Sequence, residues 1–147
     1  MSYRLFTIGY EKRTINEYID VLLNARIRVL VDVRETAWSY KRDFCKTKFG
    51  RSLGRAGITY VHIPDAGNPK KIRRNAKSIQ GCLDTYRTHL VETRSGLDQL
   101  KAVITEASSE RTNVCLTCFE RDVCNCHRGV IVEFMRRRLK PLAVVHL

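Results

Sequence analysis

The segment Arg28-Val-Leu-Val-Asp-Val33 is mostly apolar and rich in β-branched residues. Such a run is typical of a strand in a parallel sheet that is covered on both faces. The segment Ile58-Thr-Tyr-Val-His-Ile63 is a shorter version of the same pattern. We therefore expect both segments to be central strands of one sheet.

Strands and helices are predicted to alternate on either side of these two segments. Further strands are expected at Tyr3–Ile8, Asn113–Thr117 and Leu142–His146. The capping-box pattern Thr14-Ile-Asn-Glu17 predicts a helix start after the first of them. Apolar residues at helical spacing predict later helices through Ile79, Leu83, Tyr86 and Leu90, through Leu97, Leu100, Ile104 and Ala107, and from His127 to Leu139. The basic, aromatic stretch Glu35–Gly57 is expected to be a long connection with one short helix.

This alternation predicts the α/β fold class: an open, mainly parallel sheet of about five strands with helices on both faces. The chain has 147 residues, of which 44% are hydrophobic, so we expect a single domain over residues 1–147 with one sizeable core. In open sheets of this kind, ligands bind beyond the carboxyl ends of the strands. The predicted strand ends carry Thr7-Ile-Gly-Tyr-Glu11, Asp32-Val-Arg34, His62 and Cys118-Phe-Glu120, followed by Cys126-His-Arg128.

Cys126 is expected at the amino end of a helix, where the helix dipole and Arg128 favour a thiolate. This position predicts that Cys126 reacts with alkylating agents faster than Cys45 or Cys82. A helix start also suits a bound phosphate, so a nucleophile and an anion site remain alternatives. An inert, buried thiol is a further alternative, above all for Cys118 at the end of a predicted core strand.

Charge points to a polyanionic partner. The formal net charge is +12, and Arg34–Arg87 holds 13 basic and 4 acidic residues, which places most of the excess in one region. The residues expected to bind nucleic acid are Trp38, Lys41, Arg42, Lys70, Lys71, Arg73 and Arg74. We expect an enzyme that acts on nucleic acid or a nucleotide. The alternative is a non-catalytic nucleic-acid-binding protein whose rim residues form a rigid anion site.

The six cysteines are expected to be reduced thiols, because the chain shows no export signal and can form an ordinary core. A cytoplasmic location and no membrane partner are expected, since no long apolar segment is present. Cys115, Cys118, Cys124 and Cys126 could supply four zinc ligands. Their spacing differs from the two well-separated pairs of most structural zinc sites. We therefore expect no metal and no cofactor, and zinc binding is the less favoured alternative.

Several short motifs occur together over almost the whole chain: Thr7-Ile-Gly-Tyr-Glu11 with Thr14, Leu30-Val-Asp-Val-Arg34, Gly57-Ile-Thr-Tyr60, Gly67-Asn-Pro69, and Cys118-x-Glu120 followed by Cys126-His-Arg128. In order and spacing, the chain resembles the domain of unknown function 488 family. The resemblance implies an α/β domain whose signature residues look like an active site, and it implies no particular reaction. Cys115 and Cys124 are not part of that signature, and Ala66 stands where leucine is more usual.

The rim positions and the resemblance define the candidate site. The residues expected to be catalytic are Cys126, Glu120, Asp32 and His127. The residues expected to bind substrate are Thr7, Gly9, Tyr10, Glu11, Arg34, Asn68, Cys118 and Arg128. Glu120, Asp32 and Glu11 are the carboxylates suited to acid–base chemistry.

Overall fold

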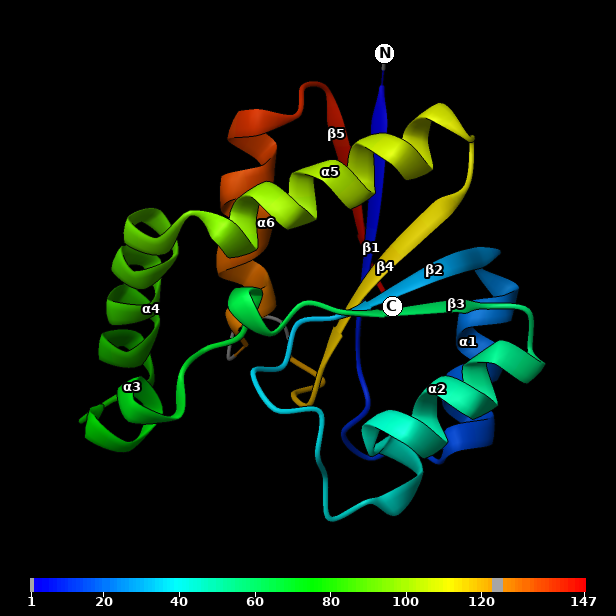
Figure 1. Cartoon of the computed structure of the whole chain (residues 1–147), viewed down its shortest axis with the longest axis horizontal. Coiled ribbons are helices and arrows are strands. Elements are labelled where there is room, and N and C mark those ends of the chain that lie inside the picture. The colour runs from blue at the N-terminus through cyan, green and yellow to red at the C-terminus, as the bar shows by residue number, and fades with distance from the viewer. Residues whose placement is uncertain (1, 123–125) are drawn as a thin grey trace.

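A computed structural model of the chain describes residues 2–122 and 126–147, and it contains a five-stranded sheet in the order β3-β2-β4-β1-β5 (Figure 1). The strands are β1 (Tyr3–Gly9), β2 (Ile27–Asp32), β3 (Thr59–His62), β4 (Asn113–Cys118) and β5 (Leu142–His146). Every neighbouring pair is parallel. The predicted α/β class, with an open parallel sheet in a single domain, is confirmed.

Helices cover both faces of the sheet, as expected. On one face, α1 (Ile15–Asn24) and α2 (Lys46–Arg55) bury Tyr18, Phe49 and Leu53. On the other, α5 (Ser95–Ser109) and α6 (His127–Arg138) bury an aliphatic core. The short α3 (Lys70–Asn75) contacts α4 (Ile79–Thr93), which packs against α5 and α6. No helix in the described ranges is long and apolar enough to cross a membrane.

The register of the strands brings their carboxyl ends to one edge. Gly9 of β1 lies beside Cys118 of β4, and Asp32 of β2 lies between Thr117 of β4 and His62 of β3. Thr14 caps α1 by accepting a hydrogen bond from the Glu17 N–H, as the capping-box pattern predicts. The connections after β1, β2, β3 and β4 therefore all start at the same end of the sheet.

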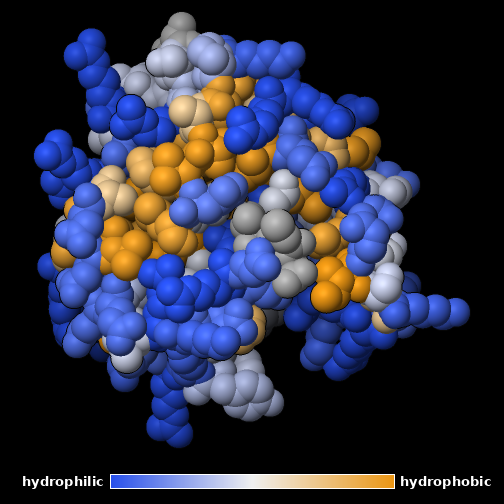
Figure 2. Space-filling model, turned by 180° about the vertical axis from the view of Figure 1, so that it is seen from behind, coloured by the Kyte–Doolittle hydropathy of each residue, from blue (hydrophilic) through white to orange (hydrophobic). Residues whose placement is uncertain are grey.

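One local expectation was wrong. β3 is an edge strand rather than a central one, because it pairs only with β2, and its residues are partly exposed. The Glu35–Gly57 connection contains one α-helix, as expected, and this helix, α2, has ten residues and follows the 3₁₀ turn Arg42–Phe44. At the opposite edge, β5 is also partly exposed, and Val145 is 43% exposed. A band of hydrophobic residues crosses the back of the molecule among hydrophilic ones (Figure 2).

Candidate functional site

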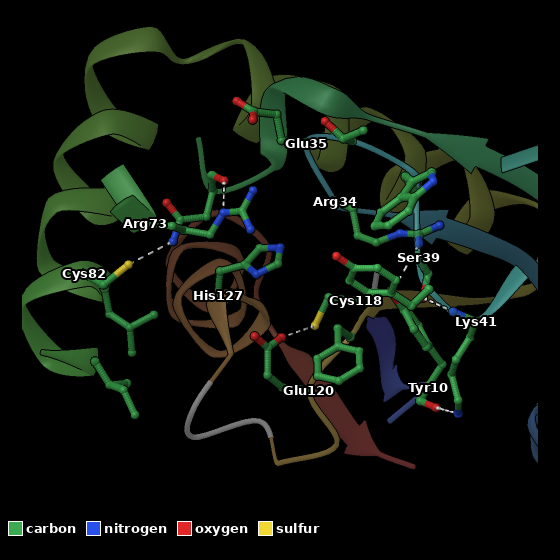
Figure 3. Close-up of a pocket in the computed structure, with 17 residues that line it drawn as sticks. Tyr10, Arg34, Glu35, Ser39, Lys41, Arg73, Cys82, Cys118, Glu120 and His127 are labelled. Carbon is green, nitrogen blue, oxygen red and sulfur yellow. Dashed lines mark hydrogen bonds between the residues drawn. The ribbon is translucent and has the colours of Figure 1, made fainter. Parts of the chain in front are cut away.

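A pocket of about 690 Å³ lies at the carboxyl edge of the sheet (Figure 3). Its wall combines three kinds of side chain. The aromatic residues are Tyr10, Trp38, Tyr40 and Phe119, the basic residues are Arg34, Lys41 and Arg73, and the chemically reactive residues are Cys118, Glu120 and His127. The pocket therefore joins part of the predicted nucleic-acid-binding region to part of the predicted catalytic set.

The end of β1 holds the loop that follows β4. The backbone N–H groups of Tyr10 and Glu11 donate to the carbonyls of Cys118 and Phe119 at 3.2 and 2.9 Å. The Glu11 carboxylate accepts a 3.0 Å hydrogen bond from the Arg121 N–H. Glu11 is thus engaged with the backbone of the loop that carries Glu120.

Thr7 lies apart from the pocket wall. It is fully buried in β1, and its hydroxyl lies 2.6 Å from His146 Nδ1 of β5. Gly9 is also behind the wall, where it permits close approach of the Glu120 backbone. Of the predicted substrate-binding residues in β1 and the segment that follows it, the pocket includes only Tyr10.

Asp32 and Arg34 form a buried ion pair at the end of β2. Arg34 Nη2 donates to Asp32 Oδ2 at 2.6 Å, and Arg34 Nε lies 2.9 Å from Oδ1. The Tyr60 hydroxyl also donates to Asp32 Oδ2, at 2.6 Å. Burial, followed by the charge of Asp32, raises the pKa of Tyr60, which keeps this hydroxyl a donor. Asp32 is fully buried outside the pocket wall, whereas Arg34 reaches the wall and donates to the Tyr10 hydroxyl.

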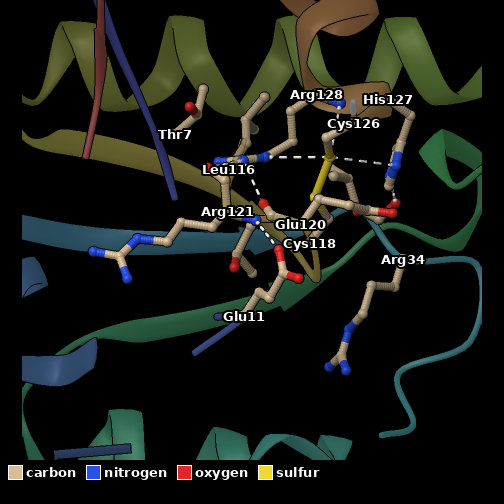
Figure 4. Close-up of a disulfide and its surroundings, with 12 residues drawn as sticks. Thr7, Glu11, Arg34, Leu116, Cys118, Glu120, Arg121, Cys126, His127 and Arg128 are labelled. Carbon is tan, nitrogen blue, oxygen red and sulfur yellow. Dashed lines mark hydrogen bonds between the residues drawn. A yellow bond between two sulfur atoms is a disulfide. The ribbon is translucent and has the colours of Figure 1, made fainter. Parts of the chain in front are cut away.

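Cys118 and Cys126 form a disulfide beside Glu120 and His127 (Figure 4). The expectation that all six cysteines are reduced is therefore wrong for this pair, while Cys45, Cys82 and Cys115 are free. Cys124 lies outside the described residues. The pair forms because the end of β4 and the start of α6 are neighbours in space, which the spacing in sequence does not reveal. One potential ligand atom from each of Cys118, Glu120, Cys126 and His127 falls within 4.8 Å of the others.

Cys126 is the N-cap of α6, as its expected position at the helix start requires. Its sulfur accepts hydrogen bonds from the Arg128 backbone N–H at 3.4 Å and from Arg128 Nε at 3.3 Å. Arg128 is 1% exposed, and burial lowers its pKa. Its Nη2 donates to the Glu120 carbonyl at 2.7 Å, so Arg128 links the helix start to the β4 loop. Cys118 lines the pocket, whereas Cys126 and Arg128 lie behind it.

His127 is oriented by a carbonyl of the neighbouring strand connection. Its Nε2 lies 2.7 Å from the Val33 carbonyl, which can only accept, so Nε2 carries the proton and Nδ1 has a free lone pair. Nδ1 lies 3.7 Å from Cys126 Sγ. Burial, opposed by the Val33 hydrogen bond, lowers the pKa of His127 to about 4, so the ring is neutral near pH 7. Burial raises the pKa of Glu120.

Of the cysteines considered for zinc, Cys115 lies apart from Cys118 and Cys126. Cys115 is buried in the core on the α1 and α2 side of the sheet, and burial raises the pKa of its thiol. Cys124 falls outside the described residues. Alternate residues of a strand point to opposite faces, which explains why Cys115 of β4 cannot join Cys118.

The predicted nucleic-acid-binding residues divide into two groups. Trp38, Lys41 and Arg73 line the pocket. Arg42, Lys70, Lys71 and Arg74 are exposed and lie outside its wall. Lys41 Nζ also donates to the carbonyls of Tyr10 and Arg13, at 3.2 and 2.5 Å, and so holds the connection after β1.

Asn68, for which the sequence predicts a substrate-binding role, is part of the pocket wall. Its Nδ2 donates to Cys82 Sγ at 3.3 Å. Its Oδ1 is buried and has no hydrogen-bond donor among the described residues. Asn68 Oδ1 is therefore available to an N–H or O–H group of a ligand.

The sequence does not predict one wall of the pocket. This wall is formed by Ile79, Cys82 and Leu83 at the start of α4. Phe119 is a further pocket residue that was not predicted. The helical spacing of α4 predicts a helix but not which end of it adjoins the sheet. Phe119 gives a clearer signal, because it lies between two predicted site residues at the end of a strand.

One protein-family model matches the chain over residues 14–135, and its description is Domain of unknown function DUF488. The matched range begins at the N-cap of α1 and ends within α6. It includes the pocket residues that follow β2, β3 and β4. Among curated proteins, no match to the chain was found.

Proposed function

The chain belongs to the DUF488 family of domains of unknown function, as its motifs predict, and we propose from its pocket that this member is an enzyme acting on a nucleotide, free or within a nucleic acid strand. The observation that carries the proposal is the composition of the pocket wall. Aromatic faces, cations and a reactive cluster border the same cavity of about 690 Å³. Small-molecule sites usually have volumes of roughly 300–1,000 Å³, which accommodates a nucleotide.

The aromatic side chains suit a base. Trp38 is 56% exposed and Tyr40 is 92% exposed, and their rings lie 4.7 Å apart in an edge-to-face arrangement. Exposed aromatic rings provide stacking surfaces for bases in proteins that bind single strands. Phe119 is 44% exposed on the wall near Glu120 and contacts Tyr10 edge-to-face. Asn68 Oδ1 supplies a buried acceptor for a polar edge of the ligand.

The cations suit phosphate. Arg73 is exposed and lines the pocket, and its Nε uses one hydrogen bond to the Asn68 carbonyl, which leaves its remaining N–H groups for a ligand. Guanidinium groups bind phosphate oxygens in a bidentate manner. Arg34 is more constrained, because Asp32 and Tyr10 already accept from it. We assign Asp32 and Arg34 to positioning the wall.

The reacting end of the pocket is the segment around Glu120. Glu120 lies on the wall with Cys118 and His127, and Cys118 Sγ is 3.5 Å from Glu120 Oε2. A carboxyl group in a partly buried site is suited to proton transfer to or from a bound ligand. We assign Glu120 the acid–base role. Cys126 and Arg128 support this end of the pocket from behind.

A non-catalytic binding protein is the alternative, and one observation favours it. A connected hydrogen-bond network joins Asp32, Arg34, Tyr60 and Tyr10. Such a network can hold the wall of an anion-binding pocket rigid without taking part in a reaction. Turnover separates the two functions. Incubating nucleotides and short oligonucleotides with the protein, and analysing them by liquid chromatography and mass spectrometry, should reveal a product that is absent with Glu120→Gln. Binding without any product would favour the alternative.

Binding itself has a built-in reporter. Trp38 is the single tryptophan of the chain and lines the pocket, so a ligand that stacks there should change its fluorescence. A nucleoside monophosphate should give a saturable change, the matching nucleoside a weaker one, and phosphate alone little or none. Calorimetry with Trp38→Phe controls for the probe. Saturable binding of none of these ligands, nor of single-stranded oligonucleotides at low salt, would contradict the proposal.

A further inference from the structure

The inner end of the pocket contains the side chains that bind zinc in proteins. Cys118 Sγ, Cys126 Sγ, a carboxylate oxygen of Glu120 and one ring nitrogen of His127 lie within 4.8 Å of one another. Thiolate, imidazole and carboxylate are the ligands of zinc sites, and soft thiolates with imidazole select zinc over magnesium or calcium. Four such groups converge from β4, its loop and the start of α6 (Figure 4).

The backbone holds the two cysteines at a separation suited to an intervening ion. Their Cα atoms are 7.6 Å apart, beyond the 4.4–6.8 Å that disulfides usually span. After reduction, the strand end and the helix start can keep the two sulfurs near each other without a bond between them. A metal ion bound by both would bridge these two elements.

His127 presents the correct atom to the sulfurs. Because Nε2 donates to the Val33 carbonyl at 2.7 Å, Nδ1 has the lone pair and faces Cys126 Sγ. Histidine ligands of metals usually donate their other ring N–H to a carbonyl or carboxylate, which fixes the ring and its tautomer. His127 has this second hydrogen bond already in place.

Arg128 completes the surroundings of the sulfurs. Its backbone N–H and Nε both donate to Cys126 Sγ, and the side chain is buried. Hydrogen bonds to a ligating thiolate stabilise its charge, and they tune the metal as other outer-shell contacts do. An open side remains toward the pocket, where Glu120 lies.

We propose that the reduced protein binds one zinc ion through Cys118 Sγ, Cys126 Sγ and His127 Nδ1, with the fourth coordination position open toward Glu120 and the pocket. Three protein ligands and an open position are typical of catalytic zinc, which lowers the pKa of a bound water. Glu120 would accept the proton of that water. The use of this water on a nucleotide rests on the proposed function, whereas zinc binding does not.

Metal binding requires the disulfide to be opened. A dithiol reductant supplies two electrons and two protons, the S–S bond breaks to give two thiols, and the reductant becomes a disulfide. Zinc then displaces the two thiol protons as it binds. The spacing of the four cysteines does not predict this site, because only Cys118 and Cys126 would bind the metal. The third ligand would be His127, and the fourth coordination position would stay open.

Elemental analysis of the protein after reduction and incubation with zinc tests the proposal. Protein reduced under anaerobic conditions, incubated with zinc sulfate and desalted should retain about one zinc per chain. Cys118→Ser, Cys126→Ser and His127→Gln should each lose most of it. Cys45→Ser is the matched control and should retain zinc, since Cys45 is a free thiol outside the cluster. Glu120→Gln should also retain zinc, and its loss there would overturn the three-ligand arrangement.

A second measurement does not depend on variants that fold. Cobalt(II) added to the reduced wild-type protein should give the intense near-ultraviolet absorption of thiolate-to-metal charge transfer, and zinc should abolish it by displacement. Absence of both the absorption and retained zinc would overturn the proposal. Trp38 fluorescence with nucleotides, measured with and without zinc, tests the proposed function separately, because ligand binding can persist where metal binding fails.

Discussion

Gly9 and Glu120 are in backbone contact: a Cβ atom added at Gly9 would lie 1.8 Å from the Glu120 carbonyl oxygen. Real Cβ atoms do not approach a carbonyl so closely, so Gly9→Ala must push the β4 loop away from β1. We expect a loss of about 1–3 kcal/mol in the free energy of unfolding, measured by urea denaturation. The displaced loop should also weaken zinc and nucleotide binding.

Gly54→Ala is the matched control. No atom lies within 4 Å of a Cβ built at Gly54, which is inside α2. Alanine should therefore stabilise that helix slightly, by about 0.5–1 kcal/mol. If Gly9→Ala were as stable as wild type, the close contact would not position the β4 loop.

The contact explains how Gly9 supports the site from outside the pocket wall. The sequence predicts Gly9, Glu11 and Asp32 at the rim, and the structure brings them there. The strand pattern predicts which residues lie at the rim, but it does not distinguish a residue that faces the pocket from one that supports the pocket wall. Glu11 accepts a hydrogen bond from the Arg121 N–H, and Asp32 accepts one from Arg34.

Replacement of Asp32 tests its bracing role. Asp32→Asn leaves the buried Arg34 guanidinium without its carboxylate partner, and loss of one member of a buried ion pair typically costs about 3–5 kcal/mol. Tyr60→Phe removes one hydrogen bond to the same carboxylate and should cost about 1 kcal/mol. Thermal or urea unfolding measures both effects. A fully stable Asp32→Asn protein with unchanged ligand affinity but no turnover would instead support the catalytic role predicted from sequence.

The parts of the fold that could be predicted are those set by local chemistry. The apolar run predicts the position of β2, and the Thr14 cap predicts the start of α1. The edge position of β3 depends on which strand pairs with which, and no single segment encodes that choice. The α4 wall of the pocket was missed for the same reason: Cys82 reaches Asn68 only through tertiary packing.

The rate at which each cysteine is alkylated should depend on its exposure and on whether it is in the disulfide, rather than on its position at a helix start. In the unreduced protein, we expect Cys45 and Cys82 to react with iodoacetamide, because they are free and partly exposed. Cys115 should stay unreactive until unfolding, since it is fully buried and burial raises the pKa of its thiol. Peptide mass spectrometry measures each residue. Fast labelling of Cys126 without reductant would restore the nucleophile hypothesis.

Reduction should make Cys118 available at the pocket wall, whereas Cys126 is buried behind it. After phosphine treatment with a chelator present, Cys118 should become labelled slowly. Zinc supplied in place of the chelator should protect Cys118 while leaving Cys45 unaffected. Labelling of Cys118 at the same rate with and without zinc would contradict the zinc site. Protection of Cys45 as well would indicate nonspecific binding.

Replacement of two neighbouring arginines of α3, Arg73 and Arg74, can distinguish binding in the pocket from binding by general surface charge. Arg73 lines the pocket and donates to the Asn68 carbonyl, whereas Arg74 lies outside the wall. Arg73→Gln should therefore weaken binding of a nucleoside monophosphate about tenfold, by the loss of roughly 1.5 kcal/mol for a charge-assisted hydrogen bond, while Arg74→Gln leaves it nearly unchanged. Trp38 fluorescence provides both affinities.

With a single-stranded oligonucleotide the two replacements should have more similar effects, because a strand that leaves the pocket can place phosphates near either arginine. The affinity should then fall steeply with salt, and each replacement should reduce the salt slope by about 0.7 per lost phosphate contact. Equal effects of the two replacements on the monophosphate would show that it is bound by surface charge, and would remove the pocket as its binding site.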